Sequence, residues 1–256
     1  MSTIERRHEI VQMTLRDGMV SVTHLANNFQ VSEVTVRGDL NYLHKKKLLI
    51  RARGGALACN EVPKELSLNE KHCAQIDIKR KLAQLAKLQI NEGEAIILDS
   101  GSTIAELASC LHSFERLVVM TNGLNVAQNL LNAPGIEVLM TGGVLRKTSL
   151  SFYGRQAEDS LERYHFDKAF LGVDGIDFNS GITTHFEYEA IMNRLMRRVA
   201  KEVITVADSS KFNRSGVHKI CGLAEIDILI TDSGIPDAFA QTLERNGVKL
   251  IIESLD

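Results

Sequence analysis

Polar residues gather where apolar runs end in the second half of the chain, and one such group has the composition of an anion site. It follows the apolar run 95–98 and precedes a helical pattern over 104–111. The group is Asp99, Ser100, Gly101, Ser102 and Thr103. Glycine permits a close backbone approach, and amides and hydroxyls at a helix N-terminus bind phosphate. The same residues are also ordinary cap-and-turn chemistry, so this stretch alone favours neither interpretation.

Comparable polar residues follow several later apolar runs. They are Thr121 and Asn122, then Gly142 and Gly143 with Arg146, then Asp174 within 172–177 and Lys211 within 207–212. Two cations, several carboxylates and a set of hydroxyl and amide groups suit a ligand with a phosphate at one end and hydroxyls at the other. The repetition favours a binding site over a series of unrelated turns.

Seven short apolar runs must position these residues. They span 95–98, 117–120, 136–140, 169–172, 203–206, 226–230 and 248–252. Helical patterns lie between them, which predicts an α/β fold with a mostly parallel sheet covered on both faces. Ligands of such sheets bind beyond the carboxyl ends of the strands, where these polar residues fall.

The first 58 residues follow a different pattern, that of a winged helix-turn-helix with the helix pair at about 20–39. Ser32 precedes the second helix, and its hydroxyl suits the free amides of the first turn. The two helices have separate apolar faces that would cross over a small core. The first face is Leu25, Ala26 and Phe29, and the second is Val34, Val36, Leu40 and Leu43.

Basic and hydrogen-bonding side chains lie where such a module would read DNA. The N-terminal end of a recognition helix reaches base edges, and the guanidinium of Arg37 can bond two acceptors of one guanine. Two further arginines precede Gly54-Gly55, a pair that permits a tight turn, and we expect them to grip phosphate as a wing. The predicted DNA contacts are Ser32, Glu33, Thr35, Arg37, Arg51 and Arg53.

The same pattern could also be an ordinary three-helix module whose charged face is only solvated. The distribution of charge along the sequence favours the DNA-binding module instead. Residues 1–58 hold 9 Lys or Arg against 5 Asp or Glu, net +4, and the remaining residues hold 21 against 27, net −6. A basic excess confined to the candidate DNA module is the electrostatic footprint of a nucleic-acid binder.

Length and composition set the organisation and exclude several classes. The 256 residues fit a small module over 1–58, a linker over 59–74 and a larger domain over 75–256. No apolar run approaches the roughly 18 residues that span a bilayer, and no signal pattern opens the sequence, so we expect a soluble cytoplasmic protein. The His and Cys residues lack metal-ligand spacing, so we expect no metal and no cofactor.

The runs Thr35-Val36-Arg37, Asp39-Leu40 and Gly54-Gly55-Ala56 resemble the DNA-binding module of the DeoR family of bacterial sugar-metabolism regulators, and the resemblance covers nearly all of the chain. Two positions depart from the family pattern. Gly38 stands where a charged or longer residue is usual, which costs about 1 kcal/mol of helix propensity relative to Ala. Lys47 stands where Gly usually ends the recognition helix.

The resemblance also implies roles in the larger domain, which is similar in fold to ribose-5-phosphate isomerases and glucosamine-6-phosphate deaminases. Residues 99–103 would form the phosphate loop, and Lys211 would lie beside the ligand. Asp174 and Glu187 would occupy the neighbourhood of the acid and base groups of the related enzymes. Phe186 stands where the family frequently has Asn, and a phenylalanine side chain cannot make the hydrogen bond to the sugar that an asparagine could. The runs 151–154 and 209–218 look closest to the branch that regulates galactosamine-type or sugar-alcohol catabolism.

Two functions compete on this basis. The first is a repressor of a sugar-catabolism operon that a phosphorylated sugar releases from its operator. The second is a sugar-phosphate isomerase or deaminase with an accessory DNA-binding-like module. The N-terminal module favours the repressor, because an isomerase has no use for it. The expected partners are double-stranded operator DNA and a phosphorylated sugar, and we expect a homodimer or homotetramer, because paired modules read paired half-sites.

Overall fold

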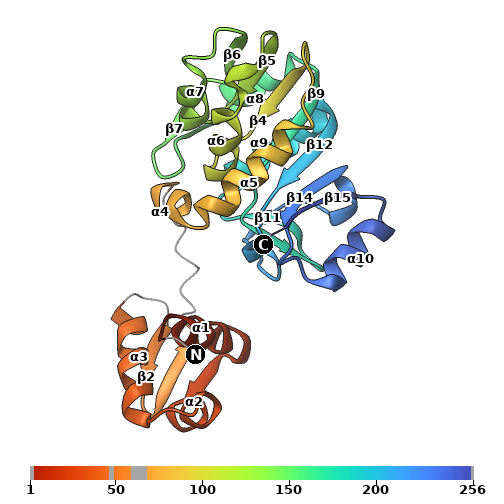
Figure 1. Cartoon of the computed structure of the whole chain (residues 1–256). Helices are drawn as coiled ribbons and strands as arrows, with labels where there is room; N and C mark the ends of the chain where they lie inside the picture. The colour runs from red at the N-terminus through yellow and green to blue at the C-terminus, as the bar shows by residue number, and fades with distance from the viewer. Residues whose placement is uncertain (1–2, 46–48, 59–67, 255–256) are drawn as a thin grey trace. The chain divides into compact units, whose positions relative to one another are not determined.

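The structure is a computed structural model that describes residues 3–45, 49–58 and 68–254 (Figure 1). The chain divides into two units, Met1–Glu65 and Leu66–Asp256. Lys47 lies outside the described residues. Within the predicted linker, residues 59–67 also lie outside them, and α4 (Leu68–Cys73) is a helix.

The first unit is a winged helix-turn-helix. α1 (Thr3–Asp17) precedes the helix pair α2 (Val22–Phe29) and α3 (Glu33–Lys45). The strands β1 (Met19–Ser21), β2 (Leu49–Ala52) and β3 (Gly55–Ala58) form an antiparallel sheet in the order β1-β3-β2. Its small core includes Ile10, Val20, Leu25, Val36, Leu40, Leu43 and Leu49.

The helix α3 begins where the sequence predicts, directly after its N-cap residue Ser32. Ser32 Oγ accepts a hydrogen bond from the amide of Thr35 at 3.1 Å, so the predicted cap is confirmed. The prediction that Val34 shares the buried face is wrong, because its side chain is 75% exposed while Val36 is fully buried. Two residues correspond to about 200° of rotation on a helix, which puts these two valines on opposite sides.

Both glycines of the wing have a structural reason. Gly54 turns the chain between β2 and β3 with φ +81°, a conformation that L side chains avoid. Gly55 packs so closely against β1 that an added Cβ would lie 2.0 Å from the carbonyl oxygen of Val20. The tight turn predicted from this pair is therefore confirmed, and Arg53 lies exposed beside it.

A buried carboxylate ties α1 to α3. Asp39 is 2% exposed, and its two oxygens accept hydrogen bonds from Arg6 Nε and Arg7 Nε, each at 2.7 Å. The Arg7 guanidinium also lies 3.9 Å from the centre of the Tyr42 ring, a cation–π distance. Asp39, one of the residues that carry the family resemblance, thus stabilises the fold of the first unit.

The second unit is built on a seven-stranded parallel sheet, and each of the seven predicted runs forms one of its strands. The strands are β4 (Ala95–Leu98), β5 (Leu117–Thr121), β6 (Ile136–Met140), β9 (Phe166–Leu171), β12 (Ala200–Val206), β14 (Ile228–Asp232) and β15 (Lys249–Glu253). Their order is β15-β14-β12-β9-β4-β5-β6, and every neighbouring pair is parallel. The predicted α/β class is confirmed.

Helices cover both faces of this sheet, as the alternation of its buried side chains requires. Ile96 and Leu98 face one core and Ile97 faces the other. The first face is covered by α5 (Ile76–Lys87), α6 (Ser102–Ser109) and α7 (Leu124–Leu130), and the second by α8 (Arg155–Glu162), α9 (Glu187–Val199) and α10 (Asp237–Arg245). None of the described helices is long and apolar enough to cross a membrane.

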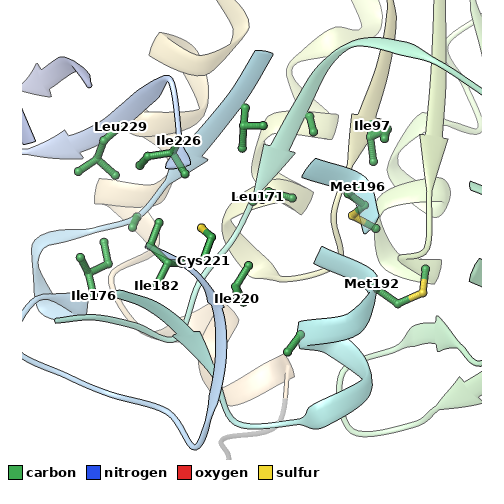
Figure 2. Packing of buried hydrophobic residues seen from close by; sticks show 14 of the residues in the cluster. Ile97, Leu171, Ile176, Ile182, Met192, Met196, Ile220, Cys221, Ile226 and Leu229 are labelled. Carbon is green, nitrogen blue, oxygen red and sulfur yellow. The ribbon is translucent and has the colours of Figure 1, made fainter. Parts of the chain in front are cut away.

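Short strands absent from the sequence prediction complete the unit. β7 (Val144–Arg146) pairs with β8 (Ser151–Tyr153), and β10 (Gly175–Asp177), β11 (Gly181–Thr184) and β13 (His218–Cys221) form a small antiparallel sheet. Figure 2 shows how one apolar core joins this small sheet to α9 and the large sheet. It labels Ile97, Leu171, Ile176, Ile182, Met192, Met196, Ile220, Cys221, Ile226 and Leu229.

Candidate functional site

The large sheet has one topological switch point, and the first polar group of the sequence lies there. From β4 the chain adds β5 and β6 on one side, and it later adds β12, β14 and β15 on the other side of β9. The loops after β4 and β9 therefore part in opposite directions, which opens a crevice where ligands of such sheets bind. Gly172 N donates to Asp99 Oδ2 across this point at 3.3 Å.

The loop after β5 also reaches the switch point of the sheet. Asn122, which is 1% exposed, accepts a hydrogen bond from Ser100 N through Oδ1 at 3.1 Å. Thr121 Oγ1 accepts from Gly123 N at 2.9 Å, which shapes the turn after β5. The structure thus brings together Asp99, Ser100, Thr121 and Asn122, as their positions after parallel strands predict.

The N-terminus of α6 supplies free donors at this crevice. Gly101 precedes the helix with φ +122°, so its conformation favours glycine. The first intrahelical bond runs from Ala105 N to Gly101 O, so the amides from Ser102 to Ile104 come before it and lack intrahelical acceptors. Ser102 and Thr103 are buried. This end of α6 has the geometry that binds anions.

Gly142 and Gly143 shape the turn between β6 and β7. Their φ angles are +67° and +107°, and an added Cβ at Gly143 would lie 2.6 Å from Tyr153 O. The two glycines therefore let the chain pass close to β8. They place Arg146, at the end of β7, next to α9.

Arg146 and Glu189 connect this hairpin to the site. Arg146 Nη1 lies 3.2 Å from Glu189 Oε1, and its guanidinium lies 4.1 Å from the centre of the Phe186 ring. Thr184 Oγ1 lies 3.0 Å from both Glu189 Oε2 and Asp174 Oδ2. Glu187 is exposed in the first turn of α9, so Glu189 is the carboxylate that the structure places beside Arg146 and Thr184.

A residue from the predicted linker also reaches this network. Lys71 of α4 donates to Asp174 Oδ1 at 2.7 Å, and their side chains are 20% and 10% exposed. Burial is the largest single effect and acts to raise the pKa of Asp174, but the charge and hydrogen bond of Lys71, together with the charges of His185 and Lys211, hold that pKa below its usual value. Because 103 residues separate the two, no local pattern in the sequence signals this pair.

Two further ammonium groups lie close by. Burial lowers the pKa of Lys211, and the positive charges of Lys71 and Arg214 lower it further, against the opposing effect of Asp208 and Asp174. Burial likewise lowers the pKa of Lys79, whose ammonium donates to the carbonyl of Ala74 at 2.6 Å. A cluster of partly desolvated cations attracts an anion.

Two buried polar atoms beside these groups have no hydrogen-bond partner among the described residues. They are His185 Nδ1 and Asn125 Oδ1. His185 N donates to Asp174 Oδ2 at 3.3 Å, and Asn125 Nδ2 donates to Gly101 O at 3.3 Å, so one atom lies at each end of the site. Buried polar groups are normally paired, so these two unpaired atoms are unusual.

The most perturbed carboxyl group of the site is Asp99. Burial raises its pKa, the negative charge of Glu189 raises it further, and the result is a pKa of about 7. Hydrogen bonds from Asn193, Ser100 and Gly172 oppose the shift. The carboxyl group thus gains or loses its proton near neutral pH.

This pKa predicts how stability depends on pH. Folded Asp99 keeps its proton up to about pH 7, whereas an unfolded Asp loses it near pH 3.9. Its contribution is therefore fully present below about pH 4 and is lost as the pH rises to 7, by at most about 1.4 kcal/mol per pH unit. We expect the unfolding free energy of Asp99→Asn, measured by denaturant titration, to rise relative to that of the wild type as the pH increases from about 4 to about 7.

Asp167→Asn is the control, because the pKa of Asp167 is lowered. The difference in unfolding free energy between Asp167→Asn and the wild type should stay constant over the same pH range. If the difference in unfolding free energy between Asp99→Asn and the wild type does not change with pH, the prediction is contradicted.

In the first unit, the predicted DNA contacts differ in how firmly they are held. Arg37 Nη2 donates to Glu33 Oε2 at 2.7 Å, and Glu33 Oε1 accepts from Thr23 Oγ1 at 3.0 Å. Arg51 is held by Asn41 Oδ1 at 3.0 Å and by Gly55 O at 2.5 Å, so it braces the wing. Arg53 is exposed at the wing tip.

Comparison with known proteins places these two units in one family. Residues 6–62 match the DeoR-like helix-turn-helix domain, and residues 74–233 match the DeoR C terminal sensor domain. The chain belongs to the DeoR family. It is a DNA-binding transcriptional regulator with a sensor domain. Among the described residues, no group of three or more His, Cys, Asp or Glu side chains is arranged to hold a metal ion.

Relatives in this family match over almost the full length. The putative aga operon transcriptional repressor of Escherichia coli O157:H7 is 47% identical over 98% of this chain and 94% of its own. The HTH-type transcriptional repressor GlcR of Bacillus subtilis is 34% identical over 98% of this chain and 97% of its own. Among solved structures, ribose 5-phosphate isomerase A of Methanocaldococcus jannaschii matches with a TM-score of 0.40 and 18% identity, over 54% of this chain and 55% of that one.

Proposed function

We propose that this DeoR-family regulator represses a sugar-catabolism operon and that a phosphorylated sugar releases it from its operator. The observation that carries the proposal is the arrangement at the switch point of the sheet. There the N-terminus of α6 follows Asp99, Glu189 lies close enough to raise the pKa of Asp99, and Asp174 pairs with Lys71 beside the partly buried Lys211. Such a site can bind an anion and hydroxyl groups at once.

The two ends of the site suit the two ends of a sugar phosphate. The N-terminus of α6 offers amides and the hydroxyls of Ser102 and Thr103 to a phosphate. Asp174 and Glu189 offer oxygens to sugar hydroxyls, and His185 Nδ1 adds an unpaired polar atom. The name of the 47% identical relative, an aga operon repressor, supports a sugar operon as the target.

A sugar-phosphate isomerase or deaminase is the alternative. The carboxylates of the site could move a proton between sugar carbons, and Asp99 has a pKa suited to such a role. Against it, the described residues of the first unit form a winged helix-turn-helix, and two relatives that match over almost their full length are named repressors. We therefore propose that the carboxylates recognise the sugar without converting it.

Operator binding requires more than one copy of the chain. A single winged module reads only a short site, whereas two modules related by a two-fold axis read paired half-sites with much higher avidity. We propose a homodimer or homotetramer that acts in the bacterial cytoplasm, where the operator DNA is.

Release from DNA tests the proposal. The full-length chain is bound to a fluorescent duplex of its own promoter region, and a panel of pentose, hexose and hexosamine phosphates is titrated while anisotropy is recorded. We expect one class of sugar phosphate to release the DNA and the matching unphosphorylated sugars to fail. The same mixtures are assayed for product. Detectable turnover would favour the enzyme, and no release by any compound would contradict the proposed effector.

A further inference from the structure

Two residues on the outer side of α3 are poor choices for folding, and they lie together. Val34 is 75% exposed in the first turn, and Gly38 follows four residues later, on the same side of the helix. A Cβ added to Gly38 would have nothing within 4 Å, so packing among the described residues does not require glycine there. Alanine would make a more stable helix.

One exposed apolar side chain needs no special explanation. Here, however, the exposed valine lies one helical turn before a glycine on the same side of α3. Together the two residues form a strip that carries an apolar side chain at one end and no side chain at the other. We define this contact strip as Val34 and Gly38. It lies at the N-terminal part of α3, the part of a recognition helix that reaches base edges.

Charged neighbours leave the strip uncovered. Arg37 Nη2 pairs with Glu33 Oε2 at 2.7 Å, and Glu33 in turn accepts a hydrogen bond from Thr23 of α2 at 3.0 Å. This chain of contacts holds the charged pair toward α2. The contact strip therefore presents an uncharged surface beside an arginine that is held in place.

We propose that the contact strip reads a thymine: Val34 packs on its 5-methyl group, and Gly38 lets the backbone of α3 approach the major groove closely. The inference rests on the proposed operator binding by α3. Thymine is the only base that presents an apolar group in the major groove. A position without a side chain permits the close approach that a small methyl contact needs.

The test removes that methyl group from the DNA. Duplexes bound by the full-length chain are first selected from random sequence, and each thymine of the selected site is then replaced by deoxyuridine, which lacks only the 5-methyl. We expect deoxyuridine at one thymine position of the site to weaken wild-type binding about fourfold, the effect of one methyl lost from an apolar contact. Val34→Ala shortens the apolar side chain and should distinguish the thymine and deoxyuridine duplexes less than the wild type does.

Matched variants separate recognition from folding. Val217→Ala removes another exposed valine, 67% exposed in the second unit, and should keep the full sensitivity to deoxyuridine. Gly38→Ala should raise the thermal midpoint of the first unit and yet weaken binding to both duplexes. This opposition between stability and affinity is the signature of a close approach.

Each failure has a distinct meaning. If no thymine is sensitive to the methyl, or if Val34→Ala keeps the wild-type sensitivity, Val34 does not read thymine. If Gly38→Ala binds as tightly as the wild type, the close approach is wrong. A wild-type chain that selects no sequence at all would contradict the proposed function and the inference with it.

Discussion

Asp39→Ala is expected to destabilise the first unit by about 3–5 kcal/mol, the cost of breaking a buried ion pair by removing one partner. The carboxylate is 2% exposed and is shared by Arg6 and Arg7, so its loss leaves the buried Arg6 guanidinium without its counter-charge. A unit of this size has a total stability of only about 3–10 kcal/mol. We therefore expect this variant to lose operator binding through unfolding.

Calorimetry of the full-length chain checks this result, because the two units should melt as separate transitions. The first-unit transition should fall or disappear in Asp39→Ala, while the transition of the second unit stays in place. Asp17→Ala is the control, since Asp17 pairs with Arg16 on the exposed surface and surface pairs contribute little. Equal melting of the two variants would mean that the buried pair does not hold α1 to α3.

Periodicity and turn chemistry were sufficient to predict much of this fold. Seven apolar runs became seven strands because both faces of a parallel sheet are buried, which leaves uninterrupted apolar residues. Ser32 and the pair Gly54-Gly55 marked the start of α3 and the wing turn because caps and positive φ angles select few residue types. Val34 was misplaced because an apolar residue in the first turn of a helix fits either face until the register of Val36 and Leu40 is fixed.

The site was predictable where it depends on strand ends and not where it depends on distant packing. Asp99, Ser100 and Asn122 follow parallel strands and therefore meet. Glu187 and Glu189 both lie in the first turn of α9, and only the rotation of that helix decides which one faces Thr184. Lys71 belongs to the predicted linker, and its partner Asp174 lies 103 residues away.

Lys211→Ala is expected to raise the effector concentration needed for release at least tenfold while leaving operator affinity nearly unchanged. Lys211 belongs to the second unit, and its ammonium is partly buried beside Asp208 and Asp174, with its pKa lowered by burial. The ammonium can add a charge-assisted contact to the bound sugar phosphate, and such a contact is worth about 1.5–3 kcal/mol. In a cell such a variant would repress constantly.

Anisotropy of operator release, with the sugar phosphate identified in the panel, measures both quantities on one protein. Lys249→Ala is the control, because Lys249 is an exposed lysine at the start of β15 and its loss should change neither. Lys211→Arg keeps the charge but changes the shape of the donor, so we expect it to fall between the wild type and Lys211→Ala. If Lys211→Ala is released at wild-type effector concentrations, the ammonium serves only its neighbours Asp208 and Asp174 and does not contact the effector.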